Sequence, residues 1–319
     1  MTEPGPAIGI DVGGTKIAAL LVDRDGTVLA RELRATPADD HRATLSTMVE
    51  AARAVAGSGV VGVGIAAAGL VDREGILRYA PNLAWRDARL VAHVSGELGL
   101  FVVADNDANA AAWGEFRHGA GSGSRNLLMV SVGTGIGGGI VLDGHLYRGA
   151  NGFAGEIGHV VVDPAGPRCP CGNRGCWEQV ASGTAITRTG QRAAARHPHS
   201  SLRERAGGDP RAVTGAMVTE AAHDGDIVSQ GIFVEVGHKL GVGIAGLVNV
   251  LDPDRVVVGG GVSEAGDLLL QPARDAFRRS VEGRHHRPDV PIVQAALGSD
   301  SGAIGAAALV FEQVDGGAR

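Results

Sequence analysis

Aromatic residues are scarce in this chain, which has six Phe, three Trp and two Tyr among its 319 residues. Its core must therefore be built mainly from Ala, Val, Leu and Ile. Positive charge is also limited, since 29 basic residues face 35 acidic ones and the formal net charge is −6. No five consecutive residues carry the same charge. Such a chain has no electrostatic attraction to nucleic acid or to an anionic membrane, so we expect neither as a partner.

Long apolar segments are missing as well. The longest uncharged run covers residues 54–71, but it contains five glycines and a serine. That composition is not hydrophobic enough for a membrane-spanning helix. The first seven residues lack the basic and apolar regions of a signal peptide. We therefore expect a cytoplasmic protein in a reducing compartment.

Glycine, in contrast, is abundant. It supplies 51 of the 319 residues, about 16% against a usual value near 7%. Many tight turns and close backbone approaches are therefore expected. At about 150 residues per domain, the length suggests two domains.

One order of strands and turns occurs twice. Residues 7–12 form an apolar run, a glycine turn follows, residues 17–22 form a second run, and an Asp-Arg-Asp-Gly turn leads to a third strand. The same order begins again 120 residues later, with a strand over 127–132, a glycine turn over 133–139 and a strand over 140–142. This predicts a two-fold internal repeat at the scale of a domain.

Apolar periodicity predicts the remaining elements. Helices are expected over residues 39–56, 87–98, 109–115, 184–195, 212–223 and 227–250, one ending near 279 and one starting at 301, and strands over 60–65, 100–104, 255–258 and 292–295. Residues 196–211 carry two prolines and paired glycines. They are expected to form an exposed connection.

Each half opens with a glycine turn that could bind phosphate. The residues are Gly13, Gly14, Thr15 and Lys16 in the first turn, and Gly133, Thr134 and Gly135, continuing to Gly139, in the second. Backbone N–H groups without neighbouring side chains can approach phosphate oxygens, although a plain hairpin turn has the same sequence. The three GxGxxG matches do not lie between a strand and a helix, and GxxxxGK[ST] does not occur. Nicotinamide dinucleotide and P-loop sites are therefore set aside.

Two further features point to a nucleotide. Asp11 directly precedes the first turn, where its carboxylate could hold Mg²⁺ beside a phosphate or could simply form the turn. A third glycine cluster, residues 259–261, follows an apolar strand and precedes a helix. A flat adenosine could lie against the bare backbone there, which makes Gly260 and Gly261 candidates for nucleotide binding.

Asp and Asn are concentrated before an alanine-rich helix, in the sequence Asp105-Asn106-Asp107-Ala108-Asn109. Capping a helix needs one such residue, and four stand here. Some of these side chains are therefore expected to bind hydroxyl groups. One carboxylate could act as a base toward a sugar alcohol.

The cysteines form a tight set: Cys169, Cys171 and Cys176. An odd number of clustered cysteines in a reducing compartment indicates a metal site and not disulfides. Together with His159 they offer four ligands, the number that a closed tetrahedral zinc site requires. We therefore expect a structural Zn²⁺. Its loop would place the neighbouring Glu156 and Glu178 near substrate hydroxyls.

Taken together, these motifs resemble those of the ROK family of bacterial sugar kinases, from Ile8 to the final helix. The resemblance is carried by residues 11–16, 106–111, 133–139, 154–159, the cysteine loop through Glu178, and 259–261. Glycine turns alone are unspecific. A loop of one His and three Cys that ends in Glu is highly specific to this family.

The resemblance implies an α/β fold of two actin-like ATPase (ribonuclease H-like) domains with an interdomain cleft and a structural zinc loop. A smaller N-terminal domain is expected over residues 1–118 plus 300–319, and a larger one over 119–299. The implied reaction is transfer of phosphate from ATP, with Mg²⁺, to the 6-hydroxyl of glucose. A homodimer or homotetramer is also implied.

Site residues follow from the resemblance by position. Asp107 is the implied base and also contacts the sugar. The other implied sugar contacts are Asn82, Asn106, Glu156, His159 and Glu178. His159 would then bind zinc through one ring nitrogen and a sugar hydroxyl through the other.

Two alternatives come from other functional classes. The family includes sugar-responsive repressors, which carry a helix-turn-helix domain before the glycine turn, whereas seven residues precede Ile8 here. A chaperone-like ATPase of the same fold would need a peptide-binding domain and would lack the zinc loop. Among kinases, N-acetylmannosamine kinase is the main alternative, and relatives that use fructose or polyphosphate are others.

Overall fold

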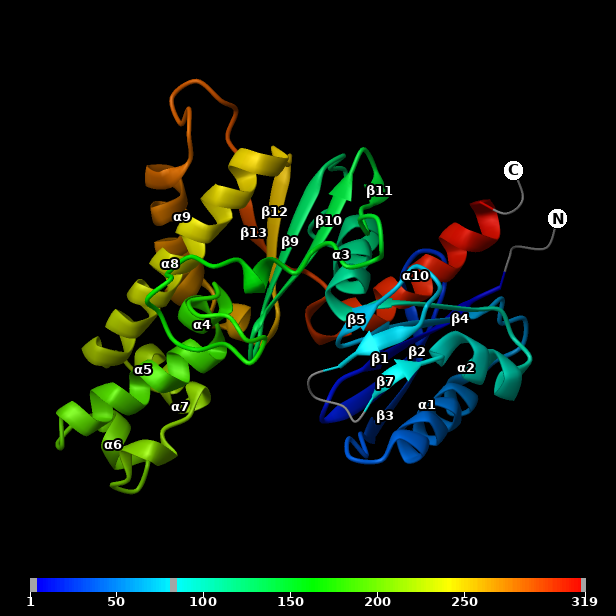
Figure 1. Cartoon of the computed structure of the whole chain (residues 1–319), viewed down its shortest axis with the longest axis horizontal. Helices are drawn as coiled ribbons and strands as arrows, with labels where there is room; N and C mark the ends of the chain where they lie inside the picture. Colours follow the sequence, from blue (N-terminus) through cyan, green and yellow to red (C-terminus); the bar gives the residue numbers. More distant parts are fainter. Residues whose placement is uncertain (1–4, 81–84, 317–319) are drawn as a thin grey trace. The chain divides into compact units, whose positions relative to one another are not determined.

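The structure is a computed structural model that describes residues 5–80 and 85–316 (Figure 1). The chain divides into two compact units. Unit 1 comprises Met1–Met129, Gly138–Gly155 and Ala295–Arg319, and unit 2 comprises Val130–Gly137 and Glu156–Gln294. The predicted domains, residues 1–118 plus 300–319 and 119–299, stay a prediction.

Unit 1 is built on a five-stranded sheet in the order β3-β2-β1-β4-β8. The strands are β1 (Ala7–Val12), β2 (Lys16–Val22), β3 (Val28–Ala35), β4 (Val63–Ala67) and β8 (Val102–Asn106). The first three form an antiparallel meander, and β4 and β8 extend it in parallel with β1. Asp11 of β1 and Asp105 of β8 both pair with Ala66 of β4. The parallel strands therefore bring the predicted acidic residues to one edge, where sheets of this kind commonly bind ligands.

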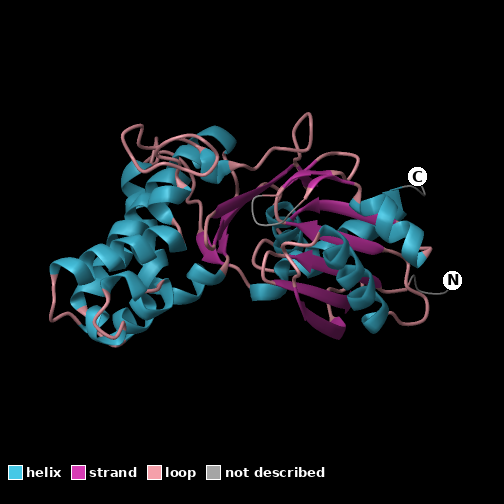
Figure 2. Ribbon diagram, turned by 60° about the horizontal axis from the view of Figure 1, so that its bottom comes forward, coloured by secondary structure: helices cyan, strands magenta, loops and turns pink. Residues whose placement is uncertain are grey.

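Helices cover both faces of this sheet (Figure 2). They are α1 (His41–Val55) and α2 (Leu90–Leu98) on one face, and α3 (Asp107–His118) and α10 (Ser301–Gly316) on the other. Helix α10 packs unusually close to the strands at two glycines. A Cβ atom added to Gly9 would stand 1.8 Å from the Ala303 carbonyl oxygen, and one added to Gly64 would stand 1.9 Å from the Ala306 carbonyl oxygen, so no side chain fits at either position. A small three-stranded sheet follows β4, formed by β5 (Leu70–Val71), β6 (Leu77–Tyr79) and β7 (Arg86–Ala88).

A second five-stranded sheet has the order β11-β10-β9-β12-β13. Its strands are β9 (Leu127–Val132), β10 (Ile136–Leu142), β11 (His145–Leu146), β12 (Arg255–Gly259) and β13 (Ile292–Gln294). The order is that of the first sheet, and β9 and β10 each begin and end 120 residues after β1 and β2. This confirms the predicted two-fold repeat.

About half of unit 2 is helical. Its helices are α4 (Glu178–Ala181), α5 (Gly183–Arg196), α6 (Ser201–Arg205), α7 (Gly215–His223), α8 (Ile227–Leu251) and α9 (Asp267–Ser280). Among the described residues, α8 is the one helix long and apolar enough to cross a membrane. It packs along α9, and half of its apolar stretch is buried within the protein.

The structure corrects two predictions of local structure. The second glycine turn is shorter than residues 133–139, because β10 begins at Ile136. Gly139 lies inside that strand, where a Cβ would stand 2.4 Å from the Cβ of Ala112, so this glycine lets α3 approach the strand. Residues 196–211 also contain a helix, α6, which Ser200 caps and which buries Leu202.

Candidate active site

Asp107 is the first residue of α3, directly after β8. Its neighbour Asn106 caps this helix, because the Asn106 Oδ1 accepts hydrogen bonds from the backbone N–H groups of Ala108 (2.9 Å) and Asn109 (3.1 Å). Burial raises the pKa of Asp107, while hydrogen bonds from the local backbone and from Asn106 lower it, and the result is a raised pKa. The Asp107 carboxylate is therefore a stronger base than a carboxylate on the surface.

Asp11 lies at the same edge of the sheet. Burial, reinforced by the charge of Asp107, raises the pKa of Asp11 to about 7, against the opposing effect of Lys16. A Cβ on Gly302 would stand 2.9 Å from the Asp11 Oδ2, so the carboxylate rests against the first turn of α10. The positive end of this helix and Lys16 are the local sources of positive charge.

Thr36, which no sequence motif indicated, holds the first glycine turn through two hydrogen bonds. The Thr36 Oγ1 donates a hydrogen bond to the Gly13 carbonyl oxygen (2.8 Å), and the Thr36 N–H donates one to that of Thr15 (3.0 Å). Within the turn, the Gly13 N–H donates to the Lys16 carbonyl oxygen (3.0 Å). Thr36 thus fixes the shape of the turn, and no motif around it in the sequence signals this contact.

Four metal-ligating side chains converge in unit 2. The ligand atoms of His159, Cys169, Cys171 and Cys176 all lie within 4.8 Å of one another. The Sγ atoms of Cys171 and Cys176 are 3.6 Å apart, and the Cys169 Sγ lies 3.7 Å from the His159 Nδ1. A tetrahedral site with Zn–S bonds of about 2.3 Å and Zn–N bonds of about 2.0 Å requires separations of roughly 3.8 and 3.5 Å. The four residues therefore fit a zinc ion.

Glu156 and Glu178 stand on either side of the His159 imidazole. The His159 Nε2 lies 3.8 Å from the Glu156 Oε2, and the His159 Nδ1 lies 3.9 Å from the Glu178 Oε1. The Nδ1 thus faces the cysteines, while the Nε2 faces Glu156. This geometry leaves one ring nitrogen for a metal and the other for a substrate hydroxyl, as the predicted double role of His159 requires.

The second glycine turn lies against Glu178. A Cβ on Gly135 would stand 2.4 Å from the Glu178 Oε2, so glycine at this position leaves room for the carboxylate. The start of α5 holds the turn, because the Gly183 N–H donates to the Gly133 carbonyl oxygen (2.8 Å) and the Thr184 Oγ1 donates to that of Thr134 (2.7 Å).

The third glycine cluster lies at the same strand end. Gly260 has a φ of +80°, and a Cβ on it would stand 2.6 Å from the Val132 carbonyl oxygen, directly before the second glycine turn. Unit 2 therefore brings the second turn, Gly260 and Glu178 together. Unit 1 brings together Asp11, Asn106 and Asp107 with the first turn. Asn82 lies outside the described residues.

Trp177 connects the cysteine loop to α8. Trp177 lies between Cys176 and Glu178 in the sequence, and its side chain is fully buried. Its Nε1 donates a hydrogen bond to the Lys239 carbonyl oxygen (3.0 Å). The indole lies on Gly243, where a Cβ would stand 2.1 Å from a ring atom. Helix α8 therefore positions the residues on both sides of Trp177.

Gly243→Ala should lower the free energy of unfolding by about 1–3 kcal/mol, because the added methyl group must displace the Trp177 ring. Chemical denaturation measures this. Gly246→Ala is the matched control, since a Cβ there meets open space and alanine should raise helix stability by roughly 0.5–1 kcal/mol. Equal stabilities of the two variants would contradict the role assigned to Trp177.

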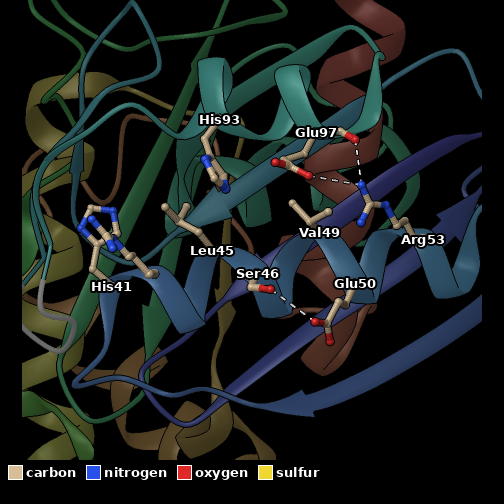
Figure 3. A pocket seen from close by; sticks show the side chains of 9 residues that line it. His41, Leu45, Ser46, Val49, Glu50, Arg53, His93 and Glu97 are labelled. Carbon is tan, nitrogen blue, oxygen red and sulfur yellow. Dashed lines mark hydrogen bonds and ion pairs between the residues drawn. The ribbon is translucent and has the colours of Figure 1, made fainter.

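A cavity of about 710 Å³ lies between α1 and α2 in unit 1 (Figure 3). Sequence reasoning pointed to none of its lining residues. Two pairs of polar side chains along it contact each other, since Arg53 lies 3.3 Å from Glu97 and Ser46 donates to Glu50 at 3.3 Å. Because no predicted site residue lines it, this cavity is separate from the candidate active site.

Comparison with known proteins identifies the family. The sequence matches the model of the ROK family over residues 7–313. The chain belongs to the ROK family. This confirms the resemblance seen in the sequence and the fold class that it implied.

Three similar proteins each match nearly the whole length of this ROK protein. It is 41% identical to a glucokinase of Streptomyces coelicolor over 97% of this chain and 98% of that protein. The structure of a ROK family glucokinase from Streptomyces griseus in complex with glucose and AMPPNP is 42% identical and matches with a TM-score of 0.89, over 97% of this chain and 100% of that one. A xylose repressor of Bacillus subtilis is 29% identical over 97% of this chain and 78% of the repressor.

Proposed function

We propose that this ROK protein is an ATP-dependent hexose kinase that phosphorylates the 6-hydroxyl of glucose, giving glucose 6-phosphate and ADP. The observation that carries the proposal is the full-length similarity to glucokinases, one of them bound to glucose and AMPPNP. The site chemistry agrees with it. A carboxylate with a raised pKa stands at the start of α3, and carboxylate and imidazole groups that can bind hydroxyls stand beside the metal ligands.

Asp107 acts as the base in this proposal. Its carboxylate accepts the proton of the 6-hydroxyl as that oxygen attacks the γ-phosphorus, and the bond from the γ-phosphorus to the ADP oxygen breaks. Phosphoryl transfer needs little covalent help, so orienting the hydroxyl is as important as removing its proton. Asn106 contributes by capping α3 and thereby fixing the position of Asp107.

The nucleotide is bound by the glycine turns in this proposal. Backbone N–H groups of residues 13–16 and 133–135 donate to phosphate oxygens, and Gly260 and Gly261 leave space for the adenosine. Asp11 is the carboxylate that would hold Mg²⁺, which when bound neutralises phosphate charge. Lys16, exposed at the start of β2, adds a positive charge near this carboxylate.

The sugar is oriented by Glu156, His159 and Glu178. Carboxylates accept hydrogen bonds from sugar hydroxyls, and the His159 Nε2 is the ring nitrogen turned away from the cysteines. The four metal ligands would hold a structural Zn²⁺, which fixes the loop that carries these groups. Asn82 and Asn106 complete the proposed sugar contacts.

The protein is proposed to act in the cytoplasm as a homodimer or homotetramer, without nucleic acid or membrane partners.

Release of ADP, measured with glucose, mannose, fructose and N-acetylmannosamine in turn, tests the sugar assignment. Glucose should give the highest kcat/KM, and replacing ATP with polyphosphate should reduce turnover. A higher kcat/KM for N-acetylmannosamine would assign the chain to that kinase class. A chain that binds sugar and releases no ADP with any of the four would contradict the kinase assignment.

Asp11→Asn should make the protein more stable at pH 8 and less active. The folded state keeps a proton on Asp11 up to about pH 7, whereas the unfolded chain releases it near pH 4, so wild-type stability falls as the pH rises between these values. Asn removes that loss, which is on the order of 4 kcal/mol for a shift of about three pKa units. Denaturant unfolding without Mg²⁺ should show this gain at pH 8 and none at pH 4. A gain of equal size at both pH values would exclude this cause.

A further inference from the structure

Asp105 is a buried carboxylate directly before the proposed sugar-binding segment. It is 4% exposed, and a buried charge requires a partner to remain ionised. Its Oδ2 accepts a hydrogen bond of 2.6 Å from the Arg148 Nε, and the Arg148 side chain is 27% exposed. The two residues are 43 positions apart in the chain, so tertiary structure brings them together.

The other oxygen of Asp105 binds the start of α3. The Asp105 Oδ1 accepts hydrogen bonds from the Asn106 N–H (2.8 Å) and from the Asn109 Nδ2 (2.9 Å). Asn106 in turn donates from its Nδ2 to the Gly69 carbonyl oxygen (3.0 Å) and caps the helix through its Oδ1. A single carboxylate therefore connects Arg148 to Asn106, directly before Asp107, and to Asn109, two residues after it.

Arg148 also organises the segment that leads to Glu156. Its carbonyl oxygen accepts a hydrogen bond from the Ala154 N–H (3.1 Å), and the next carbonyl along, that of Gly149, accepts from the Arg73 Nε (3.0 Å). At the end of this segment, Gly155 lies where a Cβ would stand 3.5 Å from the Asn109 Oδ1. The segment is therefore built against the same end of α3 that carries Asp107.

We propose that Arg148 is a positioning residue for phosphoryl transfer, which acts through Asp105 to fix the place of Asp107. This rests on the proposed function, in which Asp107 is the base. Without Arg148, the buried Asp105 carboxylate loses the guanidinium that pairs with it, and a buried charge without its partner is costly. The carboxylate then moves toward water, which loosens its hydrogen bonds to Asn106 and Asn109, and Asp107 lies between these two residues in the sequence.

A positioning role predicts an effect on kcat with little effect on the glucose KM. Misplacement of a base by a fraction of an ångström reduces the fraction of reactive complexes. In the proposed function Glu156, His159 and Glu178 also bind the sugar, so glucose binding does not rest on Asn106 and Asp107 alone. Arg148→Met should therefore lower kcat about 10- to 100-fold and change the glucose KM less than about threefold.

Charge rescue separates positioning from a general loss of structure. Arg148→Lys keeps the counter-ion and should recover most of the lost kcat. Asp105→Asn combined with Arg148→Met removes both charges but keeps the Oδ1 acceptor for Asn106 and Asn109. This double variant should turn over faster than Arg148→Met alone, a non-additivity that a double-mutant cycle measures.

Arg125→Met is the matched control. Arg125 forms the same kind of contact, from its Nε to the Asp143 Oδ1 at 2.9 Å, but both side chains are more than 70% exposed. Its loss should leave kcat unchanged. If Arg148→Met fails to fold, Arg148→Lys and Asp105→Asn are compared with the wild type in the same assays.

Two results would overturn the proposal. One is a kcat for Arg148→Met within twofold of the wild type. The other is a double variant whose kcat equals the product of the two single effects, with kcat falling in step with thermal stability. Failure of the proposed function looks different, since the wild type would then not release ADP with glucose, or Asp107→Asn would remain active.

Discussion

Asp107→Asn should lower kcat for glucose phosphorylation by about 10²- to 10⁴-fold, because the amide keeps the size and polarity of the carboxylate but cannot accept the hydroxyl proton. The cap residue Asn106 is unchanged in this variant, so α3 should remain intact. Steady-state ADP release measures kcat, and calorimetry measures glucose binding, which should stay within a few-fold of the wild type.

Asp267→Asn is the matched control for this experiment. Asp267 is the first residue of α9, as Asp107 is of α3, but its side chain is 81% exposed and pairs with Arg274. Turnover should be unaffected. If Asp107→Asn keeps more than roughly a tenth of the wild-type kcat, another group removes the proton or no base is required.

Removal of the metal should abolish activity. Purified protein is expected to contain one zinc per chain, and Cys176→Ser should lose it, because three ligands hold zinc less tightly than four. The folding energy supplied by zinc is then lost, the thermal midpoint falls, and Glu178 is no longer held beside His159. Metal analysis, thermal unfolding and ADP release measure the three effects.

His199→Ser is the control for zinc loss, because His199 is exposed and lies outside the cluster of four ligands. It should retain zinc and turnover. Two findings would contradict the zinc assignment: full turnover in protein without zinc, or a Cys176→Ser variant that binds zinc as tightly as the wild type.

The sequence predicted those elements whose apolar periodicity is long or repeated. The strands over residues 7–12 and 127–132 have the predicted bounds, and α8 ends within one residue of the prediction. Glycine was harder to interpret. At Gly139 it permits a helix to approach and at Gly135 it leaves space for a carboxylate, and neither use differs in sequence from a phosphate-binding turn.

Contacts between distant residues could not be predicted from one sequence. Trp177 and Lys239 are 62 positions apart, and Arg148 and Asp105 are 43 apart. Neither Arg148 nor Trp177 belongs to a pattern that specifies its partner, because each partner is chosen by packing across elements. The zinc ligands were an exception, since their chemistry restricts them to a few arrangements whatever the surrounding fold.

The repeat of 120 residues has a consequence for how the two copies diverged. Asp11 in the first hairpin corresponds to Ser131 in the second, and Lys16 corresponds to Ile136. The backbone of the hairpin is thus retained in both copies, whereas ionisable side chains at these two positions occur in only one. The two copies therefore share a strand order but differ in charge beside their turns. Ser131→Asp with Ile136→Lys would give the second hairpin the same two ionisable residues as the first.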